Sequence, residues 1–180
     1  DNFITFLYVG GLISEKRVDL LLNAFHALRK KYSNIKLIII GDGPLKNEIM
    51  QLIAGMNDDH VYYLGRIIKD VDQYFAASDC LVLPGVGGLA LNQAMFWRKT
   101  CIVSEADGTE DDLVIEGKTG YRFEKNNLES LADAMERRIN TSNKDILRMA
   151  DYSRDIIDKK SNVNNMVNVF VAGVKELVGD

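Results

Sequence analysis

The chain has 180 residues, a length that suits one domain of moderate size. Hydrophobic residues make up 47% of it and charged residues 27%, so a buried core is expected and a disordered chain is excluded. The formal net charge of −4 gives no electrostatic reason to expect a nucleic acid or an anionic membrane surface as a partner. No apolar run approaches the roughly 18 residues that a transmembrane helix needs.

The first segment of the chain has the pattern of a strand. Residues Phe3–Val9 are mostly apolar or β-branched, and they lack the basic-then-apolar pattern of a secretion signal. Because the sequence starts directly at a strand, we expect an upstream domain that is not part of it. We expect a cytoplasmic protein, with any peripheral membrane association made through that upstream part.

A glycine pair and a long amphipathic stretch follow the first strand. Gly10 and Gly11 interrupt the strand pattern, and apolar residues then recur with helical spacing from about Ser14 to Tyr32. Ser14 is a suitable N-cap, so the pattern predicts one helix that starts there.

The second unit repeats this layout. Ile35–Ile40 is almost continuously apolar, which is typical of a strand buried on both faces of a parallel sheet. It ends at the turn Gly41–Pro44, and Pro44 suits the first position of a helix that continues to about Met56. Further strands are predicted at 61–64, 80–83, 100–103 and 121–123, and further helices at 71–77, 89–97, 128–139, 144–159 and 162–178.

Short strands that alternate with helices predict the α/β class, with a Rossmann-like, doubly wound parallel sheet of about six strands. No linker or internal repeat divides the chain, so residues 1–180 are expected to form a single domain that ends in helices over about 143–178. Such sheets bind ligands at the carboxyl ends of their strands, near the point where the strand order reverses. The glycines gather at those ends.

The first of these loops is a candidate phosphate site. Gly10 and Gly11 would let a ligand approach the backbone closely, and the N–H groups at the start of the next helix suit an anion. Lys16 and Arg17 are expected in the first turn of that helix, where a bound anion would offset their unfavourable interaction with the helix dipole. The alternative is that both cations are solvated and partly offset by Glu15.

Two later loops are also rich in glycine. Asp42 and Gly43 fit a tight turn in which the carboxylate caps the next helix, and this structural role is the favoured interpretation. The loop after the fourth strand leads into a helix and indicates a close approach by a ligand or by backbone; its glycines are Gly85, Gly87 and Gly88. Gln93, one turn into that helix, is either a ligand of sugar hydroxyls or an ordinary helix residue.

The other reactive side chains favour structural roles. Cys80 and Cys101 lie in or beside apolar strands and are expected in the core, and His26 and His60 have no catalytic partner. Carboxylates cluster in the loop 105–112, where a solvated acidic surface is favoured over a metal site. We therefore expect no metal and no cofactor, and the sequence does not support a triad hydrolase.

Several segments, in their order along the chain, resemble the C-terminal domain of the family 4 glycosyltransferases, a GT-B group. Each segment is weakly specific by itself, but the ordered set covers nearly the whole chain. The segments are Tyr8–Leu12 with Glu15 and Lys16, Leu37–Pro44, Val61–Gly65, Tyr74–Pro84, Gly88–Leu89 with Gln93–Met95, and Asp112–Val114 with Gly117 and Gly120.

The resemblance implies a function. In this family the C-terminal half binds a nucleotide sugar, the N-terminal half binds the acceptor, and transfer usually retains anomeric configuration and needs no metal. The chain would then be the donor-binding half of a glycosyltransferase, of the kind used in cell-surface polysaccharide biosynthesis, and inactive alone. The implied partners are a UDP-, GDP- or ADP-sugar and, through the missing N-terminal domain, an acceptor glycan or lipid-linked sugar.

The sequence departs from the family at functional positions. Lys16 is kept, but the family's arginine is Gly11, its first glutamate is Gly85, its second is Gln93, and a later glutamate is Asp112. Glutamine keeps hydrogen-bonding groups for a ribose diol but lacks the charge, whereas glycine offers no side chain. These departures leave open a second hypothesis, a catalytically degenerate binding or scaffolding module. A dinucleotide enzyme ranks last, because the first turn lacks G-x-G-x-x-G.

By this resemblance, Lys16 is expected at the diphosphate with help from Arg17, Gln93 at the ribose, and Arg66 where the base packs. No catalytic residue is assigned, and the helix at 162–178 is expected to cover the interface with the missing half. The full predicted donor-binding set is Gly10, Gly11, Lys16, Arg17, Asp42, Gly43, Arg66, Gly85, Gly87, Gly88, Leu89 and Gln93.

Overall fold

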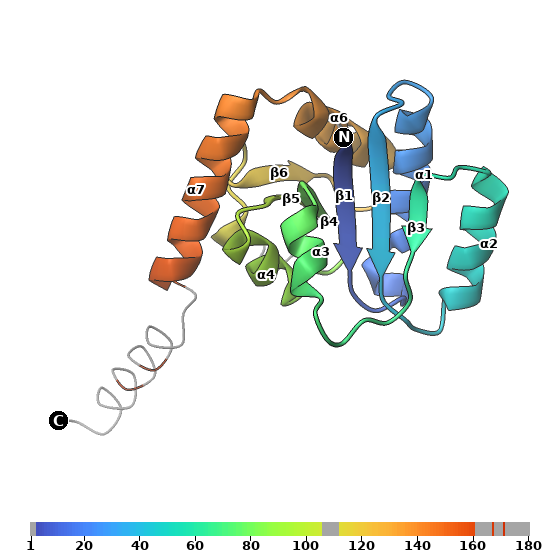
Figure 1. Ribbon diagram of the computed structural model, residues 1–180, viewed down its shortest axis with the longest axis horizontal. Helices are drawn as coiled ribbons and strands as arrows, with labels where there is room; N and C mark the ends of the chain where they lie inside the picture. Colours follow the sequence, from blue (N-terminus) through green and yellow to red (C-terminus); the bar gives the residue numbers. More distant parts are fainter. Residues whose placement is uncertain (1–2, 106–111, 161–166, 168–170, 172–180) are drawn as a thin grey trace.

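The computed structural model describes residues 3–105 and 112–160, together with residues 167 and 171 (Figure 1). Within them, six strands form one parallel sheet in the spatial order β3-β2-β1-β4-β5-β6. The predicted α/β class and doubly wound sheet are therefore confirmed. The strands are β1 (Ile4–Val9), β2 (Ile35–Ile40), β3 (Val61–Tyr63), β4 (Cys80–Leu83), β5 (Thr100–Ser104) and β6 (Gly120–Phe123).

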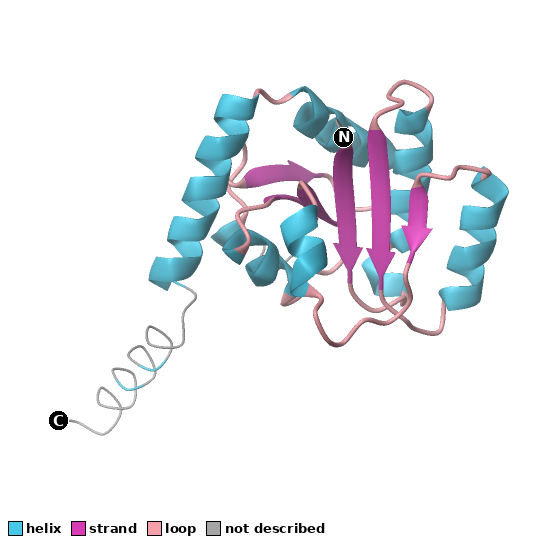
Figure 2. Ribbon diagram, in the orientation of Figure 1, coloured by secondary structure: helices cyan, strands magenta, loops and turns pink. Residues whose placement is uncertain are grey.

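Helices cover both faces of the sheet, and each predicted helix in the described ranges is present (Figure 2). One face carries α1 (Val18–Arg29), α2 (Lys46–Met56) and α6 (Leu128–Asn140), with α1 packed between the other two. The other face carries α3 (Asp72–Ala77), α4 (Ala90–Phe96) and α7 (Asn143–Lys160), with α4 packed against both of its neighbours. The strand order reverses between β1 and β4, which places the topological switch point between those two strands.

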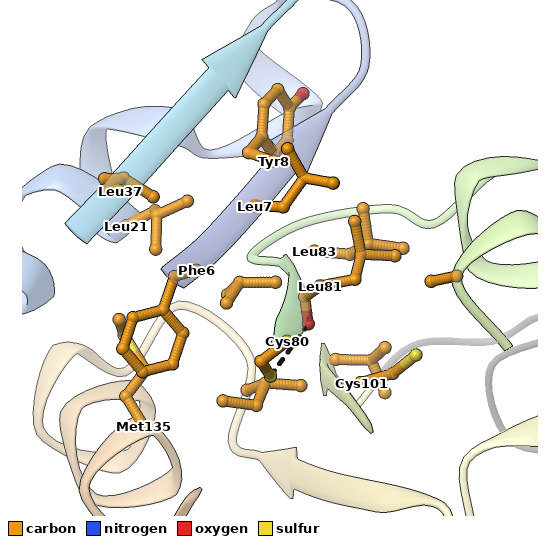
Figure 3. Close-up of a cluster of buried hydrophobic side chains, with 14 of the residues drawn as sticks. Phe6, Leu7, Tyr8, Leu21, Leu37, Cys80, Leu81, Leu83, Cys101 and Met135 are labelled. Atoms are coloured by element: carbon orange, nitrogen blue, oxygen red, sulfur yellow. Dashed lines mark hydrogen bonds between the residues drawn. The ribbon is translucent and has the colours of Figure 1, made fainter. Parts of the chain in front are cut away.

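The core lies between the sheet and the two helical layers. Phe6, Leu7 and Tyr8 of the central strand are fully buried, and Phe6 lies against Met135 of α6 (Figure 3). Burial of one such side chain stabilises the fold by about 1.5–3 kcal/mol. The apolar runs that predicted buried strands therefore form the middle of the molecule.

The predicted start of the first helix is wrong. The expected apolar stripe is buried, but α1 begins at Val18, and a separate 3-10 turn, η1 (Ser14–Lys16), precedes it. Arg17 lies between them with a φ of 50°, in the left-handed region. Ser14 donates its hydroxyl to Glu15 at 3.0 Å and caps no helix. The bend has a tertiary cause, because the Glu15 carbonyl accepts the backbone N–H of Val86 at 3.0 Å.

The start of the second helix also differs from the prediction. Pro44 lies in a turn, and α2 begins two residues later at Lys46. The backbone N–H of Leu45 donates to the carbonyl of Leu12 at 3.0 Å. The turn is thus held to the loop after β1, which delays the helix. No side chain caps α2, so the predicted capping role of Asp42 is also wrong.

The C-terminal part is described as far as α7, which agrees with its predicted range to within one residue at each end. The predicted helix at 162–178 lies outside the described residues, apart from Val167 and Val171, which are helical and exposed. Most of the predicted acidic loop, residues 106–111, also lies outside them. None of the helices that the structure describes is both long and apolar enough to cross a bilayer.

Candidate functional site

A cavity of about 570 Å³ opens at the carboxyl ends of β1, β2 and β3. Five of the predicted donor-binding residues line it, together with strand ends and Ile67. They are Gly10, Gly11, Asp42, Gly43 and Arg66. The cavity lies beside the switch point, where open α/β sheets bind their ligands. Arg66 is exposed and contributes a positive charge to the lining, and Asp42 contributes a negative one.

Some of the glycines around the cavity are required by the packing of two loops on each other. A Cβ at Gly41 would lie 1.9 Å from the Gly10 carbonyl oxygen, and one at Gly43 would lie 2.5 Å from the Leu12 carbonyl oxygen. The Leu12 N–H donates to the Asp42 carbonyl at 3.0 Å, which fixes this contact. Gly43 therefore has a structural reason to be glycine that is independent of any ligand.

Tyr8 supports the loop that begins at Gly10. Its buried hydroxyl donates to the Gly11 carbonyl at 2.7 Å, and burial raises the pKa of Tyr8 well above its usual value. A Cβ at Gly10 would lie 2.8 Å from that hydroxyl, so the Tyr8 side chain would have to shift to make room for it. At Gly11 the nearest atom to a Cβ would be the Asp42 carbonyl oxygen at 4.0 Å. Gly11 is thus the open glycine of this loop.

Lys16 lies at the switch point and joins the loops after β1 and β4. Its ammonium group donates to the carbonyls of Val86 at 2.7 Å and Gly87 at 2.5 Å. A Cβ at Gly88 would lie 3.7 Å from the same nitrogen, in ordinary contact. The carbonyl partners carry no net charge, so they orient the positive charge of Lys16 without neutralising it.

The contact between the same two loops leaves no space for a side chain at Gly85. A Cβ there would lie 1.9 Å from the Glu15 carbonyl oxygen and 2.8 Å from the carbonyl carbon of Lys16. The glutamate that the resemblance implies at this position therefore has no room. Leu89 follows at the start of α4, and its side chain is strongly exposed.

Arg17 does not lie where the sequence predicted. Its guanidinium forms a salt bridge with Asp19 at 3.0 Å and donates to the side-chain oxygen of Asn126, in the loop before α6. The hydrogen bonds to Asp19 raise the pKa of Arg17. Arg17 also precedes α1 instead of lying in its first turn. The left-handed backbone at Arg17 thus commits this cation to partners that the sequence prediction did not include.

Gln93 has a partner that sequence reasoning missed. Its side-chain amide nitrogen donates to Asp72 at 2.7 Å, and the indole N–H of Trp97 donates to the same carboxylate oxygen at 2.9 Å. These two bonds, the one from Trp97 first, lower the pKa of Asp72. No local signal pairs Asp72 with Gln93, because they lie in different helices that meet only through the packing of α3 on α4.

The remaining candidates have structural surroundings. Cys80 and Cys101 are fully buried, and burial raises the pKa of Cys80 to about 11 and that of Cys101 well above its usual value. His60 stacks on Phe3 at a ring distance of 5.5 Å and contacts Asp58. In the described ranges 3–105 and 112–160, no three His, Cys, Asp or Glu residues gather as a metal ion would require.

Comparison with known proteins decides the family. The family described as "Glycosyl transferases group 1" matches residues 4–141. The chain belongs to this family. An uncharacterized glycosyltransferase of Haemophilus influenzae is 31% identical over 154 residues, which cover 83% of this chain and 43% of that protein. This group 1 glycosyl transferase chain thus spans less than half the length of that relative.

Two solved structures share the fold. The C-terminal domain of a group 1 family glycosyl transferase from Francisella tularensis has a TM-score of 0.77 and 22% identity, and the match covers 89% of this chain and 87% of that domain. Anabaena HepE, solved in complex with UDP, has a TM-score of 0.85 and 19% identity, and the match covers 97% of this chain and 49% of HepE. This group 1 chain therefore has the Rossmann-like fold of the C-terminal half of a GT-B glycosyltransferase.

Proposed function

We propose that this chain is the donor-binding half of a glycosyltransferase that transfers a sugar from a nucleotide sugar to an acceptor. The observation that carries the proposal is the cavity at the carboxyl ends of β1, β2 and β3, together with Lys16, which joins the loops after β1 and β4 at the switch point. Family membership supports the reaction class, and HepE with its bound UDP supports the ligand class. We further propose that a second domain, outside this chain, binds an acceptor glycan or lipid-linked sugar.

In this proposal the nucleotide lies across the carboxyl ends of the strands. The base packs in the cavity against Asp42, Gly43 and Arg66, and the diphosphate passes the open side of Gly11 towards Lys16. The Lys16 ammonium is already oriented by the Val86 and Gly87 carbonyls. A cation held in place in advance stabilises the negative charge that develops on the leaving diphosphate. We propose that transfer is retaining and independent of metal, as in the family that the sequence resembles.

Calorimetric titration with UDP, GDP and ADP tests this proposal. One nucleotide is expected to bind, and Lys16→Ala is expected to weaken its binding by about 1.5–3 kcal/mol because a charged hydrogen bond to the diphosphate is lost. Lys144→Ala is the matched control, since Lys144 is exposed near the start of α7 and does not line the cavity. Absence of binding by all three nucleotides, or equal binding by the two variants, would contradict the proposal.

One observation favours a second candidate, a glycosyltransferase-like binding module without catalysis. The backbone that surrounds Gly85 leaves no room for the sugar-contacting glutamate of the family. An assay of sugar transfer by the protein together with its acceptor domain separates the two candidates. Transfer that disappears in the Lys16→Ala protein rejects the binding module, and nucleotide binding without transfer or donor hydrolysis rejects the enzyme.

A further inference from the structure

Asp72 and Gln93 form a hydrogen-bonded pair between α3 and α4. Asp72 is the first residue of α3, which follows the β3–α3 loop that carries Arg66 and Ile67 of the cavity. Gln93 lies in α4, one turn after the loop that Lys16 contacts. Both helices begin after loops that leave the carboxyl ends of strands, α3 after β3 and α4 after β4. The amide nitrogen of Gln93 lies 2.7 Å from the nearer carboxylate oxygen of Asp72.

This contact fixes which way the Gln93 amide points. A carboxylate only accepts hydrogen bonds, so the nitrogen must face Asp72 and the carbonyl oxygen of the amide must face away from it. A glutamate in place of Gln93 would bring two negative charges to hydrogen-bonding distance, which is unfavourable. A glutamine is therefore a more favourable neighbour of Asp72 than the glutamate that the resemblance implies.

The carboxylate of Asp72 is itself held in place. The indole N–H of Trp97 donates to the same oxygen at 2.9 Å. The Trp97 ring meets Phe96 edge-on at a ring distance of 6.0 Å, and the Arg154 guanidinium of α7 lies 4.0 Å from the Phe96 ring and donates to the Phe96 carbonyl at 3.0 Å. Packing from α7 thus restrains Trp97, which restrains Asp72, which orients Gln93.

We propose that Asp72 is a positioning residue for the ribose of the nucleotide. It orients the Gln93 amide so that the carbonyl oxygen accepts a hydrogen bond from a ribose hydroxyl, and its charge strengthens that bond by polarising the amide. The pair supplies the negative charge of the family's glutamate from one residue and the hydrogen-bonding atom from another. The inference rests on the proposed donor-binding function.

An exchange of the acid and the amide tests the pair. Four proteins are compared: the natural chain, Asp72→Asn, Gln93→Glu and the double variant with both substitutions. In Asp72→Asn the charge is lost and the Gln93 amide is free to rotate, whereas Gln93→Glu sets two carboxylates against each other. In the double variant the acid and the amide have changed places, so an amide again donates to a carboxylate. Asp70→Asn, which removes a nearby exposed carboxylate, is the matched control.

The measured quantity is the preference of each protein for a nucleotide with both ribose hydroxyls over the same nucleotide without them. UDP, GDP and ADP are each titrated alongside their 2′,3′-dideoxy counterparts, and the ratio of the two dissociation constants is measured for the nucleotide that binds. The natural chain and Asp70→Asn are expected to prefer the ribose by about tenfold, which corresponds to the upper end of the range for one hydrogen bond. Each single variant is expected to fall to about threefold or less, and the double variant to recover. Thermal unfolding of each variant identifies any that fails to fold.

The outcomes separate this inference from the function on which it rests. A ribose preference that is unchanged in Asp72→Asn, or that is lost in both single variants and in a folded double variant, overturns the positioning role. Nucleotide binding without any ribose preference in the natural chain overturns the same inference and leaves the donor site standing. If no nucleotide binds to the natural chain, both the inference and the proposed function fail.

Discussion

The resemblance to the family implies an arginine at the position of Gly11 and a glutamate at the position of Gly85, and the structure gives these two glycines opposite surroundings. At Gly11 a Cβ would meet no atom closer than the Asp42 carbonyl oxygen at 4.0 Å, whereas at Gly85 it would lie 1.9 Å from the Glu15 carbonyl oxygen. Neither glycine has a positive φ, so space alone distinguishes them. Gly11 leaves an open surface beside the cavity, whereas the backbone around Gly85 leaves no room for a side chain.

The difference follows from what holds each loop. The loop after β4 is bound to η1 by the Val86 N–H and by the Lys16 ammonium, so backbone fills the space that a side chain would need. The loop after β1 is held by the hydrogen bond that the Tyr8 hydroxyl donates to the Gly11 carbonyl. Its outer side faces the cavity. This fold therefore has room for an arginine in place of Gly11, but it has no room for a glutamate in place of Gly85.

The largest expected effect is that of Gly85→Glu on stability. The new Cβ cannot fit unless the loop leaves η1, so the free energy of unfolding is expected to fall by about 2–4 kcal/mol. For a chain of this size that corresponds to a fall in melting temperature of about 5–15 °C. Circular dichroism during heating measures it. Gly88→Ala is the control, since its Cβ would be in ordinary contact with Lys16; equal melting of the two variants would remove the distinction.

Gly11→Arg is the matching test on the open side. The side chain has room, and a second cation beside the diphosphate path is expected to tighten UDP binding about tenfold, through one charged hydrogen bond. Gly11→Ala is expected to change neither affinity nor stability. Calorimetric titration of both variants measures the effect, and a Gly11→Arg protein that is destabilised as much as Gly85→Glu would show that the loop is closed after all.

Tyr8→Phe tests the support of the open loop. Loss of the hydroxyl removes the bond to the Gly11 carbonyl, and the free energy of unfolding is expected to fall by about 1 kcal/mol. The same substitution removes the atom nearest to a Cβ at Gly10. Gly10→Ala is therefore expected to be less harmful in the Tyr8→Phe background, by about 0.5 kcal/mol or more in a double-mutant cycle. Strict additivity of the two substitutions would contradict the contact.

The smallest expected effect is the pH dependence of the ribose preference. The bonds from Trp97 and Gln93 lower the pKa of Asp72 below the usual value of about 3.9. The interaction is therefore fully present above that value and is lost as the pH falls through the lowered pKa of the folded state. The ratio of dissociation constants for UDP and its dideoxy form is expected to stay constant from about pH 8 to about pH 5. A change within that window, in repeated titrations, would point to a group other than Asp72.

The sequence predicted the parts of the fold that depend on local pattern. A strand buried on both faces, such as Ile35–Ile40, must be apolar throughout, and the stripe of α1 recurs at helical spacing, so both could be read directly. The left-handed backbone at Arg17 could not be read, because it accompanies a contact between η1 and a loop that follows it by about 70 residues.

The candidate site was predictable in its location and only partly in its details. Glycine at strand ends indicated the cavity edge, and Gly10, Gly11, Asp42, Gly43 and Arg66 do line one cavity. The reason for each glycine depends on which backbone atoms approach it, and that information is absent from a local pattern. The Asp72–Gln93 pair spans 21 residues and two helices, so only the packing of α3 on α4 reveals it.

The central claim is that a nucleoside diphosphate binds at the carboxyl ends of the strands. Amide NMR of the chain titrated with UDP tests this claim most directly. Chemical-shift changes are expected at the backbone amides of Gly10, Gly11, Gly43 and Arg66, and none at Asn34, which precedes β2, or at Lys144 in α7. Shift changes centred on the amino ends of the strands, or no shift changes at saturating UDP, GDP and ADP, would contradict this claim.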